Sequence, residues 1–195
     1  MGLPYVIEEH GNGERTYDLY SRLLKDRIIF IGRSFVADLA NSVTAQLLFL
    51  ESDDSEKDIT MYINSPGGHM DACMAIYDTM NYVKPDIRTV CIGHACSAAA
   101  LILAAGTKGK RSALKHSQIM LHQVSAGMDG NVADMKIFMN ETERLNKILL
   151  DELSMITGHS TKKIKKDLDR DYYMPPEEAK EYGIIDEILF SREKK

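Results

Sequence analysis

The stretch Cys91–Gly106, with the sequence CIGHACSAAALILAAG, changes from a strand pattern to a helix pattern at Ser97. The apolar run Ile87–Ile92 favours an extended strand, and the Ala, Leu and Ile residues after Ser97 favour a helix that Gly106 ends. Backbone N–H groups at such a turn stabilise an alkoxide or a tetrahedral oxyanion. Taken alone, a serine in this place is more often only a helix N-cap.

Two neighbouring segments supply what a nucleophilic serine requires. A glycine-rich turn, Ser65–Gly68, ends a predicted strand, and His122 ends the apolar strand predicted over Ser117–Gln123. Serine is a poor nucleophile unless a base lies within hydrogen-bond reach and the base has an orienting partner. We prefer His122 as the base because it ends a rigid strand beside the one that leads to the serine. The sequence by itself leaves His69 and His94 open.

Several separated motifs together resemble one family. They are Tyr62–Gly68 (YINSPGG), Ala75–Met80 (AIYDTM), Ser97 in its small-residue turn, Ala104–Gly106 (AAG), Gly109–Arg111 (GKR), Met120–Gln123 (MLHQ) and Asp169–Asp171 (DRD). In order and spacing they resemble ClpP, the family of caseinolytic protease proteolytic subunits, from about Tyr5 to about Leu189. The resemblance implies an α/β fold of the ClpP/crotonase type, a spiral of β-β-α units that forms a head, with a protruding handle helix.

The resemblance also implies a catalytic triad of Ser97, His122 and Asp171. For the acid, the residues alone leave Asp167 and Asp169 as rivals, although each fits a surface charge. We expect the Asp171 carboxylate to be partly buried, because two tyrosines follow it directly in the sequence. The order serine, histidine, aspartate along the chain is unimportant, since triads are defined by geometry.

For the oxyanion hole, the resemblance implies the backbone N–H groups of Gly68 and Ala98. Glycines let a substrate carbonyl approach closely, and the residues after Gly68 could pair with an extended peptide. Relatives commonly have Met and Gly where this chain has Ala98 and Ala99, so we expect an altered wall of the substrate pocket. Cys96 precedes the serine, and we interpret it as a small packing residue rather than the nucleophile.

The family binds apolar loops of hexameric AAA+ ATPase unfoldases in pockets between subunits. The candidate residues for this docking pocket are Tyr62, Ile92, Leu114 and Leu189. Relatives often have aromatic rings where this chain has Thr60 and Ser112, and losing two rings from the pocket could weaken docking by a few kcal/mol in total. We therefore expect altered partner affinity and a division of labour with a paralogous subunit.

Asn131–Thr157 has the apolar spacing of one long amphipathic helix, ~40 Å in length at 1.5 Å per residue. One small domain cannot cover so long a stripe. The resemblance implies a handle that packs against a subunit of an opposing ring, within two stacked heptameric rings. Asp169 and Arg170 resemble the charged pair that links the rings, although an exposed pair by itself contributes under ~1 kcal/mol.

The chain of 195 residues is long enough for one domain, and 44% hydrophobic with 27% charged residues is typical of a globular protein. Within it we expect a mobile N-terminal axial segment (1–16), a head (17–121 and 158–195) and a handle strand or loop with the long helix (122–157). A net charge of −5 gives no indication of nucleic-acid binding.

Three cysteines without a disulfide framework favour a reducing compartment. No signal peptide and no apolar run of membrane-spanning length are evident, so we expect a cytoplasmic protein. Neither P-loop spacing nor a zinc-binding Cys/His cluster occurs, so we expect no metal and no cofactor. ATP must then be hydrolysed by another protein.

We therefore predict a serine endopeptidase subunit of a self-compartmentalised protease. It would degrade unfolded polypeptides delivered by a separate ATPase and cleave short peptides by itself. Two alternatives remain at this stage: a regulatory paralogue with weak or no activity as a homo-oligomer, and a crotonase-type acyl-CoA enzyme, which uses a similar fold and oxyanion hole.

Overall fold

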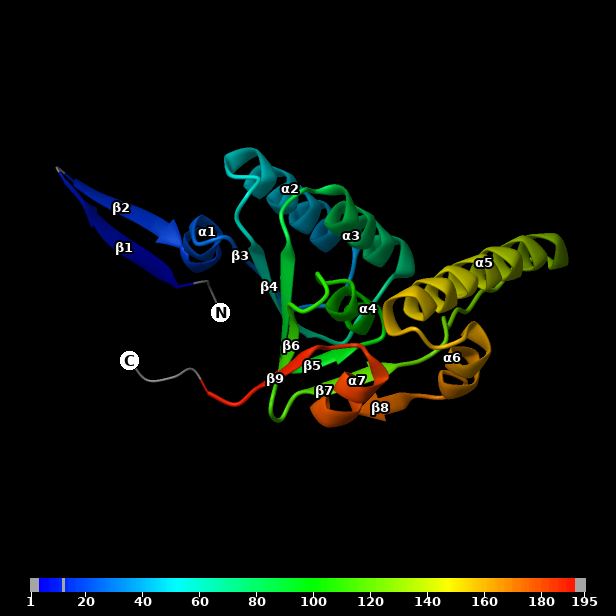
Figure 1. Cartoon of the computed structure of the whole chain (residues 1–195). Helices are drawn as coiled ribbons and strands as arrows, with labels where there is room; N and C mark the ends of the chain where they lie inside the picture. Colours follow the sequence, from blue (N-terminus) through cyan, green and yellow to red (C-terminus); the bar gives the residue numbers. More distant parts are fainter. Residues whose placement is uncertain (1–3, 12, 192–195) are drawn as a thin grey trace.

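The computed structural model describes residues 4–11 and 13–191 (Figure 1). Parts of the predicted N-terminal segment (1–3 and 12) and of the predicted head (192–195) lie outside the described residues. A seven-stranded sheet forms the centre, and five of its strands follow one another as parallel neighbours. In spatial order these are β3 (Ile28–Ile31), β4 (Ile59–Ser65), β5 (Ile87–Cys96), β6 (Arg111–Leu114) and β9 (Glu187–Leu189).

Two further strands extend the sheet at the end of β5. Strand β7 (Gln118–Leu121) pairs in parallel with the last residues of β5, and β8 (Tyr172–Met174) pairs antiparallel with β7. The last residues of β5 therefore pair with β7 rather than with β6. This divergence of strands creates the place where the site lies.

Three helices cover one face of the sheet: α2 (Ala37–Asp53), α3 (Met70–Tyr82) and α4 (Ala98–Ala104) (Figure 1). Every residue of α4 is buried. Burial alternates strictly along β4, so that Met61 and Ile63 face the helices while Tyr62 faces the other side. The core thus fixes which way each strand residue points.

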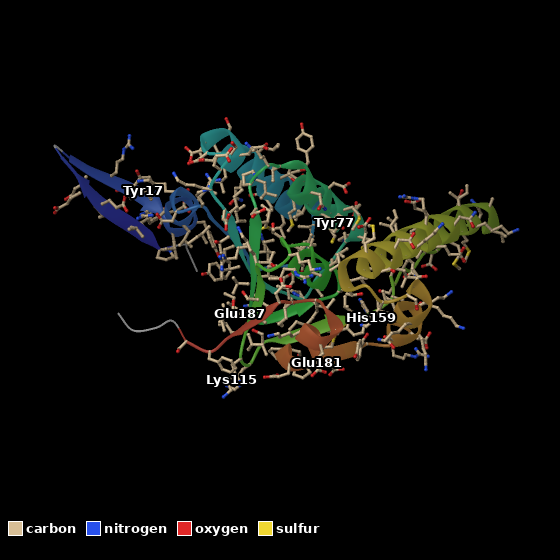
Figure 2. The ribbon with its side chains drawn as sticks, viewed as in Figure 1. Tyr17, Tyr77, Lys115, His159, Glu181 and Glu187 are labelled. Carbon is tan, nitrogen blue, oxygen red and sulfur yellow. The ribbon has the colours of Figure 1, made fainter. Side chains whose placement is uncertain are left out.

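The predicted long helix is present as α5 (Val132–Thr157). The Asn131 side chain caps its first turn, and Gly158, in the left-handed conformation, ends it. Only its C-terminal half packs on the head, through buried residues such as Leu149 and Leu153, while the other half projects beyond it (Figure 1). Tyr77 of α3 donates a hydrogen bond to Glu152 where the two helices meet (Figure 2).

The N-terminal region contains two strands that the sequence analysis did not predict. Strands β1 (Tyr5–His10) and β2 (Gly13–Asp18) form an antiparallel hairpin, followed by α1 (Leu19–Lys25). The hairpin has few buried side chains, so its polar composition concealed the strands. Glycine at position 11 has a positive φ of 46°, which suits the tight reversal of the chain.

Two strands within the head were also missed. Strand β6 begins with Arg111, whose charge indicates a loop, but its guanidinium is buried in an ion pair with Asp186 at 2.6 Å. Strand β8 has three residues, too few for a strand pattern to stand out in the sequence. In both cases the strand depends on a partner far away in the sequence: Asp186 for Arg111 and strand β7 for β8. The local sequence does not identify such a partner.

Helix α2 runs through Asp53, into the charged stretch 51–57 (ESDDSEK). The side chain of Arg27 explains the extension, because it donates hydrogen bonds to the main-chain carbonyls of Leu50 and Asp54 at 2.9 and 2.8 Å. These bonds satisfy carbonyls at the helix end. Within the described residues, no helix combines the length and the apolar character needed to cross a membrane.

Candidate active site

Ser97 lies at the turn between β5 and α4, as the sequence pattern predicts. Its backbone has a φ of 55° and a ψ of −122°, a conformation that non-glycine residues seldom adopt. The Ser97 N–H donates to the carbonyl of Met120 at 2.7 Å, next to the pair formed by Cys96 and Met120 in the β5–β7 ladder. The serine is therefore held against the end of β7.

His122 directly follows β7 and bridges the other two polar groups. Its Nε2 lies 2.8 Å from the hydroxyl oxygen of Ser97, and its Nδ1 lies 3.2 Å from Oδ1 of Asp171. The strand register explains the second contact, because Leu121 pairs with Tyr172, so the residue after β7 meets the residue before β8. In this order, Nδ1–H donates to the carboxylate and the Nε2 lone pair accepts the serine proton.

The Asp171 carboxylate is more open than expected. Its side chain is 54% exposed, so the predicted partial burial against the following tyrosines is wrong. The Tyr172 ring packs elsewhere, because its hydroxyl donates to Glu178 at 2.6 Å and its ring meets that of Tyr182, while Tyr173 is 50% exposed. The Tyr172 ring therefore packs on helix α7 (Pro176–Tyr182), and the Asp171 carboxylate stays at the surface.

The rival acids have other surroundings. Asp167, at the end of α6 (Thr161–Asp167), accepts hydrogen bonds from Lys163 at 2.6 Å and from Tyr182 at 2.9 Å. Asp169 lies 4.0 Å from Arg170, and these side chains are 73% and 94% exposed. Neither carboxylate contacts His122 within the part of the chain that the structure describes.

The alternative bases and the alternative nucleophile fit less well. His69 borders the same cavity as Ser97 and His94 lies on β5, but neither imidazole is hydrogen-bonded to the serine across residues 4–11 and 13–191. Burial raises the pKa of the Cys96 thiol, and the negative charge of Asp171 raises it further. Cys96 is therefore a protonated packing residue rather than a thiolate nucleophile.

Of the two glycines after Pro66, Gly67 is packed against the serine turn and Gly68 against the backbone of Phe35. A side chain at Gly67 would place its Cβ 2.5 Å from the carbonyl oxygen of Cys96, and one at Gly68 would place it 2.4 Å from the carbonyl oxygen of Phe35. Both glycines have positive φ, 89° and 152°. Among the described residues, the N–H groups of Gly68 and Ala98 have no hydrogen-bond acceptor outside regular secondary structure. They are thus available to a negatively charged oxygen.

A cavity of about 670 Å³ opens beside these groups and reaches the handle. The head contributes Gly68, Met70, Ser97 and Ala98, and α5 contributes Phe138, Thr142, Leu145 and Leu149. Ala98 and Ala99 are buried, and Ala98 is also one of the residues that line the cavity. The sequence analysis did not assign the α5 residues to the site. Their spacing of four, three and four residues indicates one helix face, but not what that face covers.

The four candidate docking residues lie on neighbouring strands β4, β5, β6 and β9, at positions Tyr62, Ile92, Leu114 and Leu189. Leu114 pairs directly with Leu189, and the Leu114 side chain is exposed. Ser112 is buried and donates to the Thr89 carbonyl at 3.2 Å, so it adds no apolar surface there. The strand register therefore brings these candidates to one region of the sheet.

A serine hydroxyl aligned with an imidazole and a carboxylate is the arrangement that serine hydrolases use, and the α/β scaffold carries it here between diverging strands. Comparison with known proteins defines the class further. A family model described as Clp protease matches residues 11–192. The chain therefore belongs to the Clp protease family, and it is a ClpP-type serine peptidase.

Two similar relatives come from different bacteria. The chain is 55% identical over 187 residues to the ATP-dependent Clp protease proteolytic subunit 1 of Prochlorococcus marinus. These matched residues make up 96% of this chain and 95% of that protein. It is 54% identical over 187 residues to the proteolytic subunit 2 of Bacillus licheniformis, covering 96% and 98%. These similarities support the peptidase interpretation over the acyl-CoA alternative.

Proposed function

We propose that the chain hydrolyses peptide bonds with Ser97 as the nucleophile, His122 as the general base and Asp171 as the orienting acid. The observation that carries this proposal is the continuous line of contacts, 2.8 Å from Ser97 to His122 and 3.2 Å from His122 to Asp171. As the serine attacks the carbonyl carbon, its proton passes to Nε2. The carboxylate keeps Nδ1 protonated and stabilises the imidazolium that forms.

The tetrahedral oxyanion would be held by the N–H groups of Gly68 and Ala98. Imidazolium then gives its proton to the departing amine, which leaves an acyl-enzyme on the serine. Water, deprotonated by the same imidazole, releases the acid product and restores the hydroxyl. An extended peptide would lie along the residues after Gly68, with one side chain in the cavity between head and handle.

We propose that the handle supports assembly into two stacked heptameric rings. Its projecting half exposes large apolar side chains, among them Val132 at 69%, together with Met135, Ile137 and Met139. Apolar area of this kind on a helix that leaves the head favours burial against another subunit. The exposed Asp169–Arg170 pair would lie at the ring contact, and the number of subunits comes from the resemblance.

We propose that a hexameric AAA+ ATPase unfoldase delivers unfolded polypeptides, and that it docks at Tyr62, Ile92, Leu114 and Leu189. Both relatives are named subunits of an ATP-dependent protease, which supports such a partner. The polar residues Thr60 and Ser112 weaken docking in this proposal. The numbered names of the relatives fit a chain that shares its assembly with a paralogous subunit, and three free cysteines fit the cytoplasm.

The test compares the purified protein with Ser97→Ala on a fluorogenic short peptide and on an unfolded protein. We expect peptide cleavage without ATP, and a loss of more than ~10⁴-fold in the variant. Ser125→Ala removes another serine at the cavity edge and serves as a control for a nearby hydroxyl. Equal activity of Ser97→Ala and the parent protein would contradict the proposal, and an inactive but fully assembled parent would support the regulatory alternative.

A further inference from the structure

Gln123 joins the two elements that carry His122 and Asp171. It directly follows the histidine, and its backbone N–H donates to the carbonyl of Leu168 at 2.9 Å. Its side-chain amide nitrogen donates to the carbonyl of Asp169 at 3.1 Å. One residue thus makes two hydrogen bonds to the turn that ends in the triad carboxylate, and both start next to the base.

The turn is anchored at its ends and open in its middle. Leu168 is fully buried, and Tyr172 is paired with Leu121 in the sheet. Between these anchors, Asp169, Arg170 and Asp171 are exposed. In the described ranges 4–11 and 13–191, the Gln123 amide makes the one side-chain hydrogen bond to a main-chain atom of residues 168–171.

We propose that Gln123 is a positioning residue that holds the Asp171 carboxylate against Nδ1 of His122. This inference rests on the proposed triad. If the amide bond is lost, the middle of the turn can move away from β7 while its ends stay fixed. The carboxylate then no longer selects one imidazole tautomer, and proton transfer from Ser97 slows.

The neighbouring residue makes a contact of a different kind. The N–H of Val124 donates to the side-chain carbonyl of Asn146 on α5 at 3.0 Å. Successive residues after the base therefore reach first the acid turn and then the handle. The short segment of Gln123 and Val124 therefore contacts both the turn that carries Asp171 and the handle helix α5.

The test replaces the amide without changing the length of the side chain. In the full assembled protein, Gln123→Met removes the donor, and Gln123→Glu replaces it with an acceptor. We expect kcat on a short peptide to fall about 5- to 50-fold with KM within about twofold, the scale of a small misplacement of a reacting group. Gln46→Met is the matched control, because its amide donates only to Ser42, far from the triad, within the described chain.

The split between kcat and KM distinguishes positioning from substrate contact, since Gln123 also borders the cavity. A rise in KM at unchanged kcat would overturn the proposal. Combining Gln123→Met with Asp171→Asn provides a second readout, in which we expect less than about twofold further loss because both changes remove the same function. If the loss of kcat in the double variant equalled the product of the two single losses, the positioning role of Gln123 would also be overturned.

Failure of the inference is distinguishable from failure of the proposed function. If Ser97→Ala is inactive and Gln123→Met retains the parental kcat, the triad stands and the positioning role is wrong. If Ser97→Ala is as active as the parent, the proposed function itself is wrong. Activities are normalised to the assembled fraction by size-exclusion chromatography, and agreement between the Met and Glu variants guards against a folding defect in either one.

Discussion

The two halves of the triad are built in different ways. Ser97 and His122 lie at the ends of two adjacent parallel strands, β5 and β7, whose neighbouring residues Ala95, Ile119 and Leu121 are fully buried. Asp171 lies in an exposed turn before β8, with 54% of its side chain open to solvent. The core therefore fixes the nucleophile and the base, whereas a few polar contacts fix the acid.

This difference separates folding from catalysis within one site. A change to the strand half disturbs buried backbone, so activity and stability should fall together. A change to the turn half removes an exposed contact, so activity should fall while the free energy of unfolding hardly changes. An acid held in this way can also move without unfolding the head, which is a route by which assembly could control activity.

The largest effect is expected for His122→Ala. Without the imidazole, no base lies within hydrogen-bond reach of Ser97 in the described structure, and turnover of a short peptide should fall by more than ~10⁴-fold. Initial rates with purified, assembled protein measure the loss. Activity above a hundredth of the parental rate would show that another base, such as His69, serves the serine.

Asp171→Asn should reduce kcat on the order of 10²- to 10⁴-fold, because the amide favours the wrong imidazole tautomer. The midpoint of thermal unfolding should stay within a few degrees of the parental value, since the side chain is exposed and the change in stability is below about 1 kcal/mol. A large loss of stability would break the distinction drawn between the two halves.

Gly68→Ala should damage both properties at once. The added Cβ would lie 2.4 Å from the Phe35 carbonyl oxygen, and the residue would keep a strained φ of 152°. We expect a loss of about 10²- to 10³-fold in kcat from the displaced N–H, and about 1–3 kcal/mol in stability. Gly13→Ala is the control, because a Cβ there meets nothing within 4 Å. Parental stability for Gly68→Ala would contradict the close packing of Gly68 against Phe35.

The smallest effect concerns Asp186, whose side chain is only 20% exposed. Burial is the largest single influence and acts to raise its pKa, but hydrogen bonds from Arg111 and from the Gly109 N–H outweigh it and lower the pKa below the ordinary value of 3.8. Because the pKa is lowered in the folded state, this carboxylate stabilises the fold at neutral pH. That contribution is lost as pH falls below about 3.8.

Asp186→Asn should therefore lower stability at pH 7 by about 1–3 kcal/mol and flatten the decline of stability below pH ~4. Urea unfolding at a series of pH values measures both. Asp171→Asn is the comparison, because that side chain is 54% exposed, and its loss of stability at pH 7 should stay below about 1 kcal/mol. Equal losses of stability in the Asp186 and Asp171 variants would contradict the view that the exposure of a carboxylate decides how much it stabilises the fold.

Much of this architecture could be predicted from the sequence, and the exceptions share a cause. The strand-to-helix change at Ser97 and the apolar spacing of α5 are local signals, and the fold and long helix expected from them and from the family resemblance are confirmed. Strand β6 was missed because the charge of Arg111 is neutralised by Asp186, which lies 75 residues further along the chain. Partners so distant leave no trace in local composition.

The site shows the same limit. The motifs indicated which residues to bring together, but not the exposure of Asp171 or the role of α5 as one wall of the cavity. Both depend on how elements pack after they form. The contact between Gln123 and the Asp169 carbonyl belongs to this group, because a side chain that bonds to main chain places no demand on the identity of its partner.

The most direct test labels the protein with a fluorophosphonate and locates the adduct by mass spectrometry after digestion. A serine activated by an adjacent imidazole reacts, whereas an N-cap serine and a protonated thiol do not. We predict a single adduct on Ser97 that abolishes peptide cleavage and is absent in His122→Ala. An unlabelled Ser97 in a protein that cleaves peptides, or an adduct on another residue that accounts for the loss of activity, would contradict the account.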